Sequence, residues 1–238
     1  IAVMERAAHA AISGGVRALM VREPALEDGA FLELALRLRA VLEGAWGSDG
    51  GWLAVHDRLH LAKAAGADAV HLGGTSLGLE HARRVVGDSM ALGASSHAAD
   101  APGDFSGADY LLHAPVFAPM SKPLDGRVAL GWECAESFAA AADVPAVGLG
   151  GITAESLAES LGEGVPDHPA GRSSRRLHGV ALIGGLWGSD STPIDGMSRA
   201  LTDTRGIHAR AVELTRICSE AFGSSGALPD AAIGGSLG

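Results

Sequence analysis

The feature of this sequence that most constrains its fold is a regular alternation of short apolar runs with segments of helical periodicity. Each apolar run ends in a Gly, Pro or polar cluster, which is typical of βα units in a parallel sheet. Seven runs predict strands, at residues 16–23, 52–57, 69–74, 90–97, 110–117, 146–151 and 179–186. The segments that predict helices are 26–42, 58–65, 79–86, 134–142 and 155–161.

A further helical pattern, at residues 2–12, opens the chain, and in an alternating βα sequence such a helix follows a strand. An eighth strand before Ile1 would complete a closed barrel, whereas an open doubly wound sheet usually shows a nucleotide-type glycine fingerprint after its first strand. We therefore expect an α/β fold of the (βα)8 TIM-barrel type over residues 1–204, with its first strand missing from this chain.

Residues beyond 204 do not continue the alternation. Apolar side chains at a spacing of three or four predict an extra C-terminal helix at residues 205–222. Residues 223–238 are rich in Gly, Ser and Ala, and we expect them to be disordered. The polar segment 162–178 lies between a helix and the next strand, which predicts a surface insertion on the face opposite the active site.

The formal net charge of −10, without a run of Lys or Arg, argues against nucleic acid or an anionic membrane as the main partner, since either needs a basic patch. No apolar segment approaches the length of a bilayer span, and no secretory pattern opens the chain, so we expect a cytoplasmic protein. Cys134 and Cys218 lack metal-ligand spacing and are interpreted as reduced packing residues. A small-molecule site is therefore expected, and a homo-oligomer is left open.

In a barrel, catalytic side chains come from the carboxyl ends of the strands and the loops that follow. Two glycine pairs lie there on the last two predicted strands, Gly150–Gly151 and Gly184–Gly185. Backbone amides freed of side chains ahead of a helix bind phosphate, and barrels favour this position. Each pair alone could be a plain turn, but the occurrence of both favours a phosphate site.

Charged and titratable residues occupy other strand ends. Arg22 and Lys122 are cations that can pair with phosphate oxygens, although a salt bridge to a rim carboxylate is an equal alternative for each. His56 and His113 supply imidazoles suited to proton transfer, and we expect His113 to face the pocket. His71 lies in the middle of a predicted strand and is interpreted as a hydrogen-bonded core residue.

Taken together, these stretches resemble the thiamine phosphate synthase/TenI family. Seven segments carry the resemblance in the family's order: GGVRALMVRE (14–23), VHDRLHLAKAAGADAVHLG (55–73), LGASSH (92–97), GADYLLHAPVFAPMSK (107–122), LGW (130–132), VPAVGLGGI (144–152) and GVALIGGL (179–186). The resemblance implies a (βα)8 barrel that binds thiazole phosphate. Synthases of the family join it to a hydroxymethylpyrimidine pyrophosphate with Mg²⁺, whereas TenI-type members catalyse an aromatising tautomerisation of the thiazole.

The same resemblance implies which site residues are kept. They are Arg22, Asp57, Ser95, Lys122, Gly150, Gly151, Ile183 and Gly184, with Ser121 in place of a Thr. Asp57 is the one rim carboxylate that could hold Mg²⁺, and a single carboxylate makes a weak site unless a substrate phosphate completes it.

Departures from the synthase pattern concentrate where the pyrophosphate would lie. Met20 and Pro24 stand where the synthase pattern has a Gln and a Lys on either side of Arg22. His56 replaces an Asn before the metal-binding Asp, and Ser76 replaces the second metal-binding Asp. Pro119 replaces a Thr before Lys122. These losses remove electrostatic stabilisation that a pyrophosphate leaving group needs. The histidine that serves TenI falls at Pro115, so His113 or His56 would have to replace it.

We therefore expect a TenI-like barrel of thiamine metabolism that binds a thiazole phosphate and acts as a tautomerase, with no certain cofactor. Two alternatives stay open. The first is an active thiamine phosphate synthase, which would require Mg²⁺. The second is a non-catalytic barrel that binds a phosphorylated ligand.

Overall fold

The computed structural model describes residues 1–48, 50–118, 128–162, 177–182, 186 and 203–222. Its centre is one all-parallel sheet with the strand order β1-β2-β3-β4-β5-β6-β7. The strands are β1 (Ala18–Val21), β2 (Trp52–His56), β3 (Ala69–Leu72), β4 (Ala91–Ser96), β5 (Tyr110–His113), β6 (Ala146–Leu149) and β7 (Val180–Ala181). All seven lie within the runs that the sequence predicts, so the alternation of βα units is confirmed.

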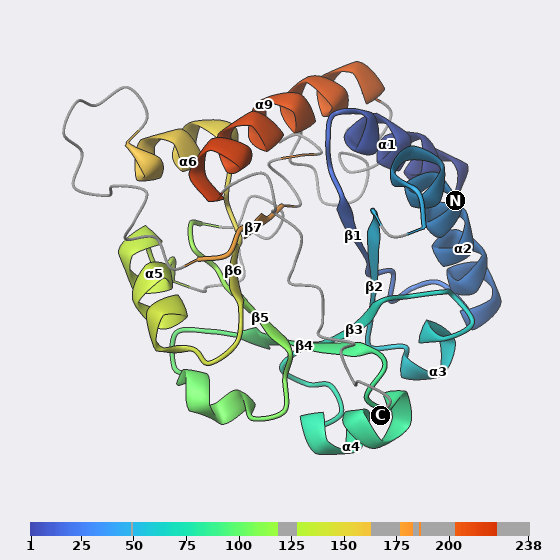
Figure 1. Cartoon of the computed structure of the whole chain (residues 1–238), viewed down its shortest axis with the longest axis horizontal. Helices are drawn as coiled ribbons and strands as arrows, with labels where there is room; N and C mark the ends of the chain where they lie inside the picture. Colours follow the sequence, from blue (N-terminus) through green and yellow to red (C-terminus); the bar gives the residue numbers. More distant parts are fainter. Residues whose placement is uncertain (49, 119–127, 163–176, 183–185, 187–202, 223–238) are drawn as a thin grey trace, which may run out of the picture.

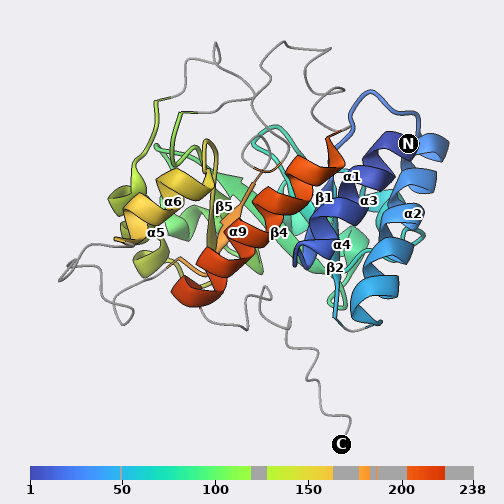
Figure 2. The same cartoon turned by 90° about the horizontal axis from the view of Figure 1, so that it is seen from above.

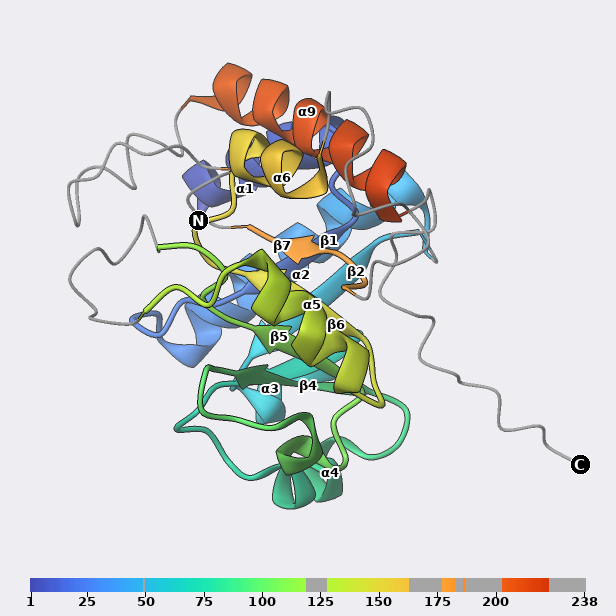
Figure 3. The ribbon, with the colours of Figure 1, turned by 90° about the vertical axis from the view of Figure 1, so that its left-hand side faces the viewer.

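The helices surround the outer face of the curled sheet (Figure 1). They are α1 (Ala2–Ser13), α2 (Asp28–Trp46), α3 (Leu59–Ala62), α4 (Leu79–Val86), α5 (Trp132–Ala141), α6 (Ala154–Leu161) and α9 (Thr204–Phe222). Figure 3 shows α5 over the outer face of β5 and β6. A short 3-10 helix, η1 (Pro102–Phe105), was not predicted, because four residues with Pro and Gly carry no helical periodicity.

Helix α9 lies in the ring of helices, between α6 and α1 (Figure 2). Ile207 and Ala211 of α9 are fully buried in the same apolar cluster as Ala7 and Ala11 of α1. The sequence predicts this helix as an addition to a barrel, and the structure places it in contact with α1 and α6, two helices that pack around the sheet. None of the helices that the structure describes combines the length and apolarity needed to cross a bilayer.

The sheet is buried on both faces, so the alternation of side chains along each strand separates two kinds of core. One face packs on the helices, as in the cluster that joins Phe31 of α2 to Val55 of β2 and Val70 of β3. The other face forms a cluster contributed by strands alone. Its buried members are Ala54, Ala69, Ala91, Tyr110, Leu112 and Val147. We call this strand-only face the inner face, because it lines the inside of the curl.

The sequence Gly-Ala-Asp occurs twice, immediately before β3 and before β5, and it ties neighbouring strands together at their amino ends. Asp68 accepts a hydrogen bond from the backbone amide of Leu53 at 2.6 Å and pairs with Arg39 of α2. Asp109 accepts from the amide of Leu92 at 2.6 Å and pairs with Arg83. These anchors lie at the amino ends of the strands, so a site at the carboxyl ends of the strands is separate from them.

Candidate functional site

Polar side chains from four consecutive strands meet on the inner face. His56 of β2 and His71 of β3 are partners in the parallel register, and their ring centroids are 5.8 Å apart. The Nε2 atom of His71 lies 2.9 Å from the hydroxyl of Ser95 on β4. The ring of Tyr110 on β5 lies 5.6 Å from that of His71. His71 also stands beside Gly93 of β4, which is in turn the register partner of Tyr110. In-register residues of parallel strands point the same way, so the sheet brings the two histidines and the tyrosine together.

Asp57 follows β2 directly and completes the group at the rim. One oxygen of its carboxylate accepts a hydrogen bond from Nδ1 of His56 at 2.9 Å. The other oxygen accepts a hydrogen bond from the Ser76 hydroxyl. Ser76 in turn accepts from the backbone amide of Gly73 at 2.7 Å. Asp57 has a φ of 64°, and it is the only non-glycine residue with positive φ in the described part of the chain. A left-handed residue at a strand end is typical of a functional site.

The two histidines are neutral in this setting. Burial lowers the pKa of the His56 imidazole below its ordinary value, Asp57 partly offsets the shift, and the positive charge of Arg22 adds to it. Burial lowers the pKa of His71 to about 3, with His56 as the second cause. Because the carboxylate of Asp57 accepts a hydrogen bond from Nδ1–H of a neutral His56, Nε2 of that imidazole carries the free lone pair. His56 is therefore set up as a base.

Arg22 follows β1 and shares the inner side of that strand with Met20, which packs against the inner cluster. Its charge contributes to the lowered pKa of both His56 and His71. The Arg22 side chain is exposed, and no hydrogen bond or ion pair of its guanidinium is found within the described ranges. It is thus a cation at the rim that is available to an anionic ligand.

Two buried polar atoms of the inner face lack a partner among the described residues: Nδ1 of His71 and the hydroxyl of Tyr110. Both side chains are at most 2 % exposed. Burial also raises the pKa of the Tyr110 hydroxyl, so it stays a donor. An unsatisfied buried group costs about 1–3 kcal/mol. The inner face is therefore a place where a ligand or water would gain hydrogen bonds.

The glycine pair after β6 is required by the backbone. Gly150 and Gly151 have φ values of 101° and 63°. A Cβ on Gly151 would lie 2.4 Å from the carbonyl oxygen of Ala118, and one on Gly150 would lie 2.8 Å from Pro115. The amide of Phe117 donates to the carbonyl of Gly150 at 2.9 Å. The pair thus packs the β6–α6 turn against the segment after β5, and its role in phosphate binding stays a prediction.

His113 does not lie in this site, contrary to the prediction. It is the last residue of β5, and its ring stacks on Phe138 of α5 with centroids 3.8 Å apart. Its Nδ1 lies 3.0 Å from the Ser96 hydroxyl, and the side chain is 2 % exposed. Because Tyr110 and Leu112 point to the inner face, alternation turns His113 to the helices. Of the two predicted imidazoles, only His56 faces the site.

Several predicted site residues lie outside the described ranges: Ser121, Lys122, Ile183, Gly184 and Gly185. His71 was interpreted as a core residue and is indeed buried, but its contact with Ser95 also makes it part of the site. The signal that could have revealed this is its register: His71 stands beside His56 once the two runs are paired as parallel strands.

The donor atoms around Asp57 do not fit a Mg²⁺ ion by themselves. Mg²⁺ requires a near-octahedral set of oxygen ligands, usually with one or two carboxylates. Asp57 is a single carboxylate, and both of its oxygens already accept hydrogen bonds from His56 and Ser76. Within the described residues, no three His, Cys, Asp or Glu side chains are grouped so as to hold a metal.

Comparison with known proteins gives a consistent result. Residues 2–170 match the family described as thiamine monophosphate synthase. A thiamine-phosphate synthase from Methanoculleus marisnigri is 33 % identical over 82 % of this chain and 85 % of that protein. The thiamine biosynthesis bifunctional protein ThiM/ThiE from Symbiobacterium thermophilum is 37 % identical over 76 % of this chain, but over only 35 % of its own length.

The fold has the same relatives among solved structures. A thiamine phosphate pyrophosphorylase from Pyrococcus furiosus superimposes with a TM-score of 0.70 at 24 % identity, over 92 % of this chain and 91 % of that chain. At this level of identity, the similarity shows the fold alone. It supports the curled parallel sheet with helices on its outer face.

Proposed function

The chain belongs to the thiamine monophosphate synthase family of thiamine biosynthesis, and we propose that it binds a thiazole phosphate and catalyses proton transfer on the thiazole ring. The observation that carries this proposal is the His56–Asp57–Ser76 arrangement beside Arg22. It provides an oriented neutral base next to the exposed guanidinium of Arg22, and the tautomerisation of a phosphorylated heterocycle needs such a base and such a cation.

The chemistry follows from the hydrogen bonds. Nε2 of His56 takes a proton from the ring of the substrate, and the carboxylate of Asp57 stabilises the imidazolium that forms. The same nitrogen returns the proton to another atom of the ring, so the net reaction is an isomerisation. Gly73 keeps the approach open, because a Cβ at that position would lie 3.3 Å from Nε2 of His56. Arg22 pairs with the phosphate.

The polar inner face gives the substrate further hydrogen bonds. The hydroxyl of Ser95, 2.9 Å from Nε2 of His71, and the hydroxyl of Tyr110, which has no partner among the described residues, lie on the same inner face as the base. Neutral His71 adds no charge that would repel the imidazolium of His56. By the family resemblance, Lys122 and the glycine turns complete the phosphate site.

Replacement of the base tests the proposal. In purified protein we expect His56→Gln to lower kcat for thiazole phosphate tautomerisation by about 100-fold or more, because general base catalysis contributes roughly that much. His9→Gln, on the exposed face of α1, is the matched control and should keep full activity. A wild-type protein that shows no saturable binding of thiazole phosphate would refute the proposal.

A second candidate function is thiamine phosphate synthesis. The names of the relatives favour it, as do the retained Arg22, Asp57 and Ser95. Against it stands the donor set around Asp57, which does not fit Mg²⁺. This candidate predicts thiamine phosphate formation from both substrates with Mg²⁺ and complete loss of formation in EDTA, whereas the tautomerase activity should be insensitive to EDTA.

The third possibility is a barrel that binds a phosphorylated ligand without catalysis. Since His113 faces the helices, His56 is the one of the two predicted histidines whose replacement distinguishes catalysis from binding alone. Cells in which His56→Gln fully replaces the wild type without any thiamine requirement would support the binding role.

We also propose that the curled sheet belongs to a closed barrel. The parallel ladder described here ends at β1 and β7, and a strand inserted between them would close the curl into a (βα)8 barrel. The cytoplasmic location and a homo-oligomer stay predictions.

A further inference from the structure

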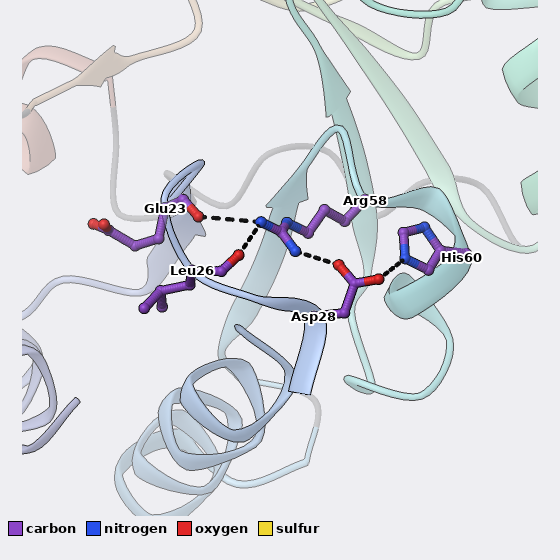
Figure 4. Close-up of polar contacts among 5 residues, drawn as sticks. All are labelled: Glu23, Leu26, Asp28, Arg58 and His60. Carbon is purple, nitrogen blue, oxygen red and sulfur yellow. Dashed lines mark hydrogen bonds and ion pairs between the residues drawn. The ribbon is translucent and has the colours of Figure 1, made fainter. Parts of the chain in front are cut away.

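Arg58 joins the two loops that carry the rim residues of the site (Figure 4). It directly follows Asp57 and precedes α3. Its guanidinium pairs with the carboxylate of Asp28, the first residue of α2. It also donates to the backbone carbonyls of Leu26 and, at 3.4 Å, of Glu23. One side chain after β2 therefore binds two carbonyls of the loop after β1 and the first residue of α2.

Two further contacts fix the geometry of this clamp. The guanidinium lies over the ring of Phe31, 4.6 Å from its centroid, and Phe31 is 1 % exposed. The second oxygen of the Asp28 carboxylate accepts a hydrogen bond from Nε2 of His60 at 2.8 Å. The pKa of Asp28 is held below its usual value, by the hydrogen bond from His60 first and by Arg58 as well. Asp28 is therefore ionised at neutral pH and remains a partner for Arg58.

We propose that Arg58 is a positioning residue, which holds the loop of residues 22–27 against the Asp57 segment and so keeps Arg22 over the inner face. The inference rests on the proposed function in one respect, namely that Arg22 contacts the phosphate of the substrate. Glu23, whose carbonyl Arg58 binds, is the residue next to Arg22. Arg22 itself has no anchoring contact in the described part of the chain, so its position depends on its backbone.

The position calls for arginine in particular. A planar guanidinium presents five donors in a fixed fork and stacks on an aromatic ring, whereas a lysine ammonium is a point charge that does neither. Arg58 uses this fork to bind a carboxylate and two carbonyls at once while its plane lies over Phe31. Lysine would keep the attraction to Asp28 and lose the simultaneous contacts.

The first experiment measures the loop directly. Amide hydrogen exchange of the full chain is followed at residues 23–28 in wild type, Arg58→Met, Arg58→Lys and the control Arg37→Met. Arg37 lies on α2 and pairs with Glu5 and Glu33 at the surface, so its loss removes ion pairs without touching the loop. We expect exchange to rise about tenfold in Arg58→Met, less in Arg58→Lys, and not in Arg37→Met. Unchanged exchange in a folded Arg58→Met would overturn the proposal.

The second experiment tests the coupling to Arg22. The dissociation constant of thiazole phosphate is measured by calorimetry for Arg22→Met, Arg58→Met and the double variant. If Arg58 acts through Arg22, each single change should weaken binding by about tenfold, and the second should add little to the first. Fully multiplicative effects would mean that Arg58 contributes in another way and would refute the positioning role.

The two proposals fail in distinguishable ways. If Arg22→Met leaves binding of thiazole phosphate unchanged, the phosphate role of Arg22 is wrong, and the exchange experiment still decides whether Arg58 holds the loop. Thermal unfolding of every variant identifies a general loss of structure. Should Arg58→Met not fold, Arg58→Lys with the same two measurements decides both questions.

Discussion

Asp57 combines an unusual backbone conformation with two hydrogen bonds to its carboxylate. A left-handed conformation is costly for most residues, by about 1–2 kcal/mol, but Asp and Asn tolerate it best. The position therefore needs a short polar side chain, and the amide of Asp57 is held in place by the carbonyl of His71 at 3.0 Å. Asn at this position would keep the backbone and remove only the charge, which makes Asp57→Asn an informative change.

The pH dependence of the reaction should report His56. The base must be neutral, so kcat/KM should fall as the pH drops through its pKa, which burial places below the ordinary value of about 6.5. Asp57 raises that pKa, so Asp57→Asn should move the acid limb to still lower pH and also lower kcat. A pH–rate profile of both proteins measures this. An acid limb that moves to higher pH would contradict the role of Asp57.

Ser76 occupies the position of the second metal-binding carboxylate in the synthase pattern, and its hydroxyl already contacts Asp57. Ser76→Asp would place two carboxylates side by side. Their repulsion should lower the melting temperature in EDTA, and Mg²⁺ should restore it, since paired carboxylates bind the ion. Calorimetric titration with Mg²⁺ should show binding at least tenfold tighter than in wild type. The same melting temperature with and without Mg²⁺ would rule out this location for the metal.

At the scale of the elements, the two Gly-Ala-Asp anchors fix the amino ends of neighbouring strands. Asp68 and Asp109 each bind a strand amide and an arginine, but Arg39 is the more buried partner, with 10 % of its side chain exposed against 25 % for Arg83. Removal of the carboxylate takes the shortest ion pair from the arginine, and that cost grows with burial, although Glu43 stays 4.0 Å from Nε of Arg39. The anchor before β3 should therefore contribute more stability than the one before β5.

Urea unfolding can compare the two anchors. We expect Asp68→Ala to lower the free energy of unfolding by about 2–4 kcal/mol, because Arg39 and the amide of Leu53 both lose a partner. Asp109→Ala should cost less. Glu80→Ala, which breaks an exposed pair with Arg84, should change stability by less than about 0.5 kcal/mol. Equal losses at positions 68 and 109 would show that burial of the arginine does not set the cost.

The strands could be predicted from the sequence because each apolar run is bounded by turn residues, and all seven are found. The face of the sheet to which each side chain points could not be predicted from the sequence. A parallel sheet with helices outside and a filled curl inside is apolar on both faces, so hydrophobicity does not distinguish them. His113 and His71 show the consequence, since both are buried histidines in apolar strands. The strand pairing places His71 beside His56, and the alternation along β5 turns His113 toward Phe138.

Some residues of the candidate site could be predicted from the sequence, and others could not. Arg22, His56, Asp57 and Ser95 follow from their positions at strand ends and from the family resemblance. Arg58 carried no signal as a site residue, because its contacts are with a loop more than thirty positions earlier in the chain. Such long-range contacts of a single side chain have no sequence periodicity, so they need coordinates.

At the scale of the whole molecule, the ring of helices depends on how α9 docks on α1. The contact is made by small residues, since a Cβ on Gly14 would lie 2.5 Å from the Cβ of Ala211 and 2.9 Å from the carbonyl of His208. The apolar cluster at this contact also includes residues of β5 and β6, such as Leu111 and Ala146. A change at Gly14 therefore tests how firmly the last helix stabilises the sheet.

Gly14→Ala should force α1 and α9 apart, because overpacking against backbone cannot be relieved by a rotamer change. We expect the free energy of unfolding to fall by about 1–3 kcal/mol and amide exchange in α9 to accelerate. The matched control is Gly29→Ala in α2, where nothing lies within 4 Å of the new Cβ. That change should raise stability by about 0.5–1 kcal/mol, because alanine is the better helix former. If Gly14→Ala proves as stable as Gly29→Ala, α9 is not docked closely on α1, and the ring of helices does not depend on this contact.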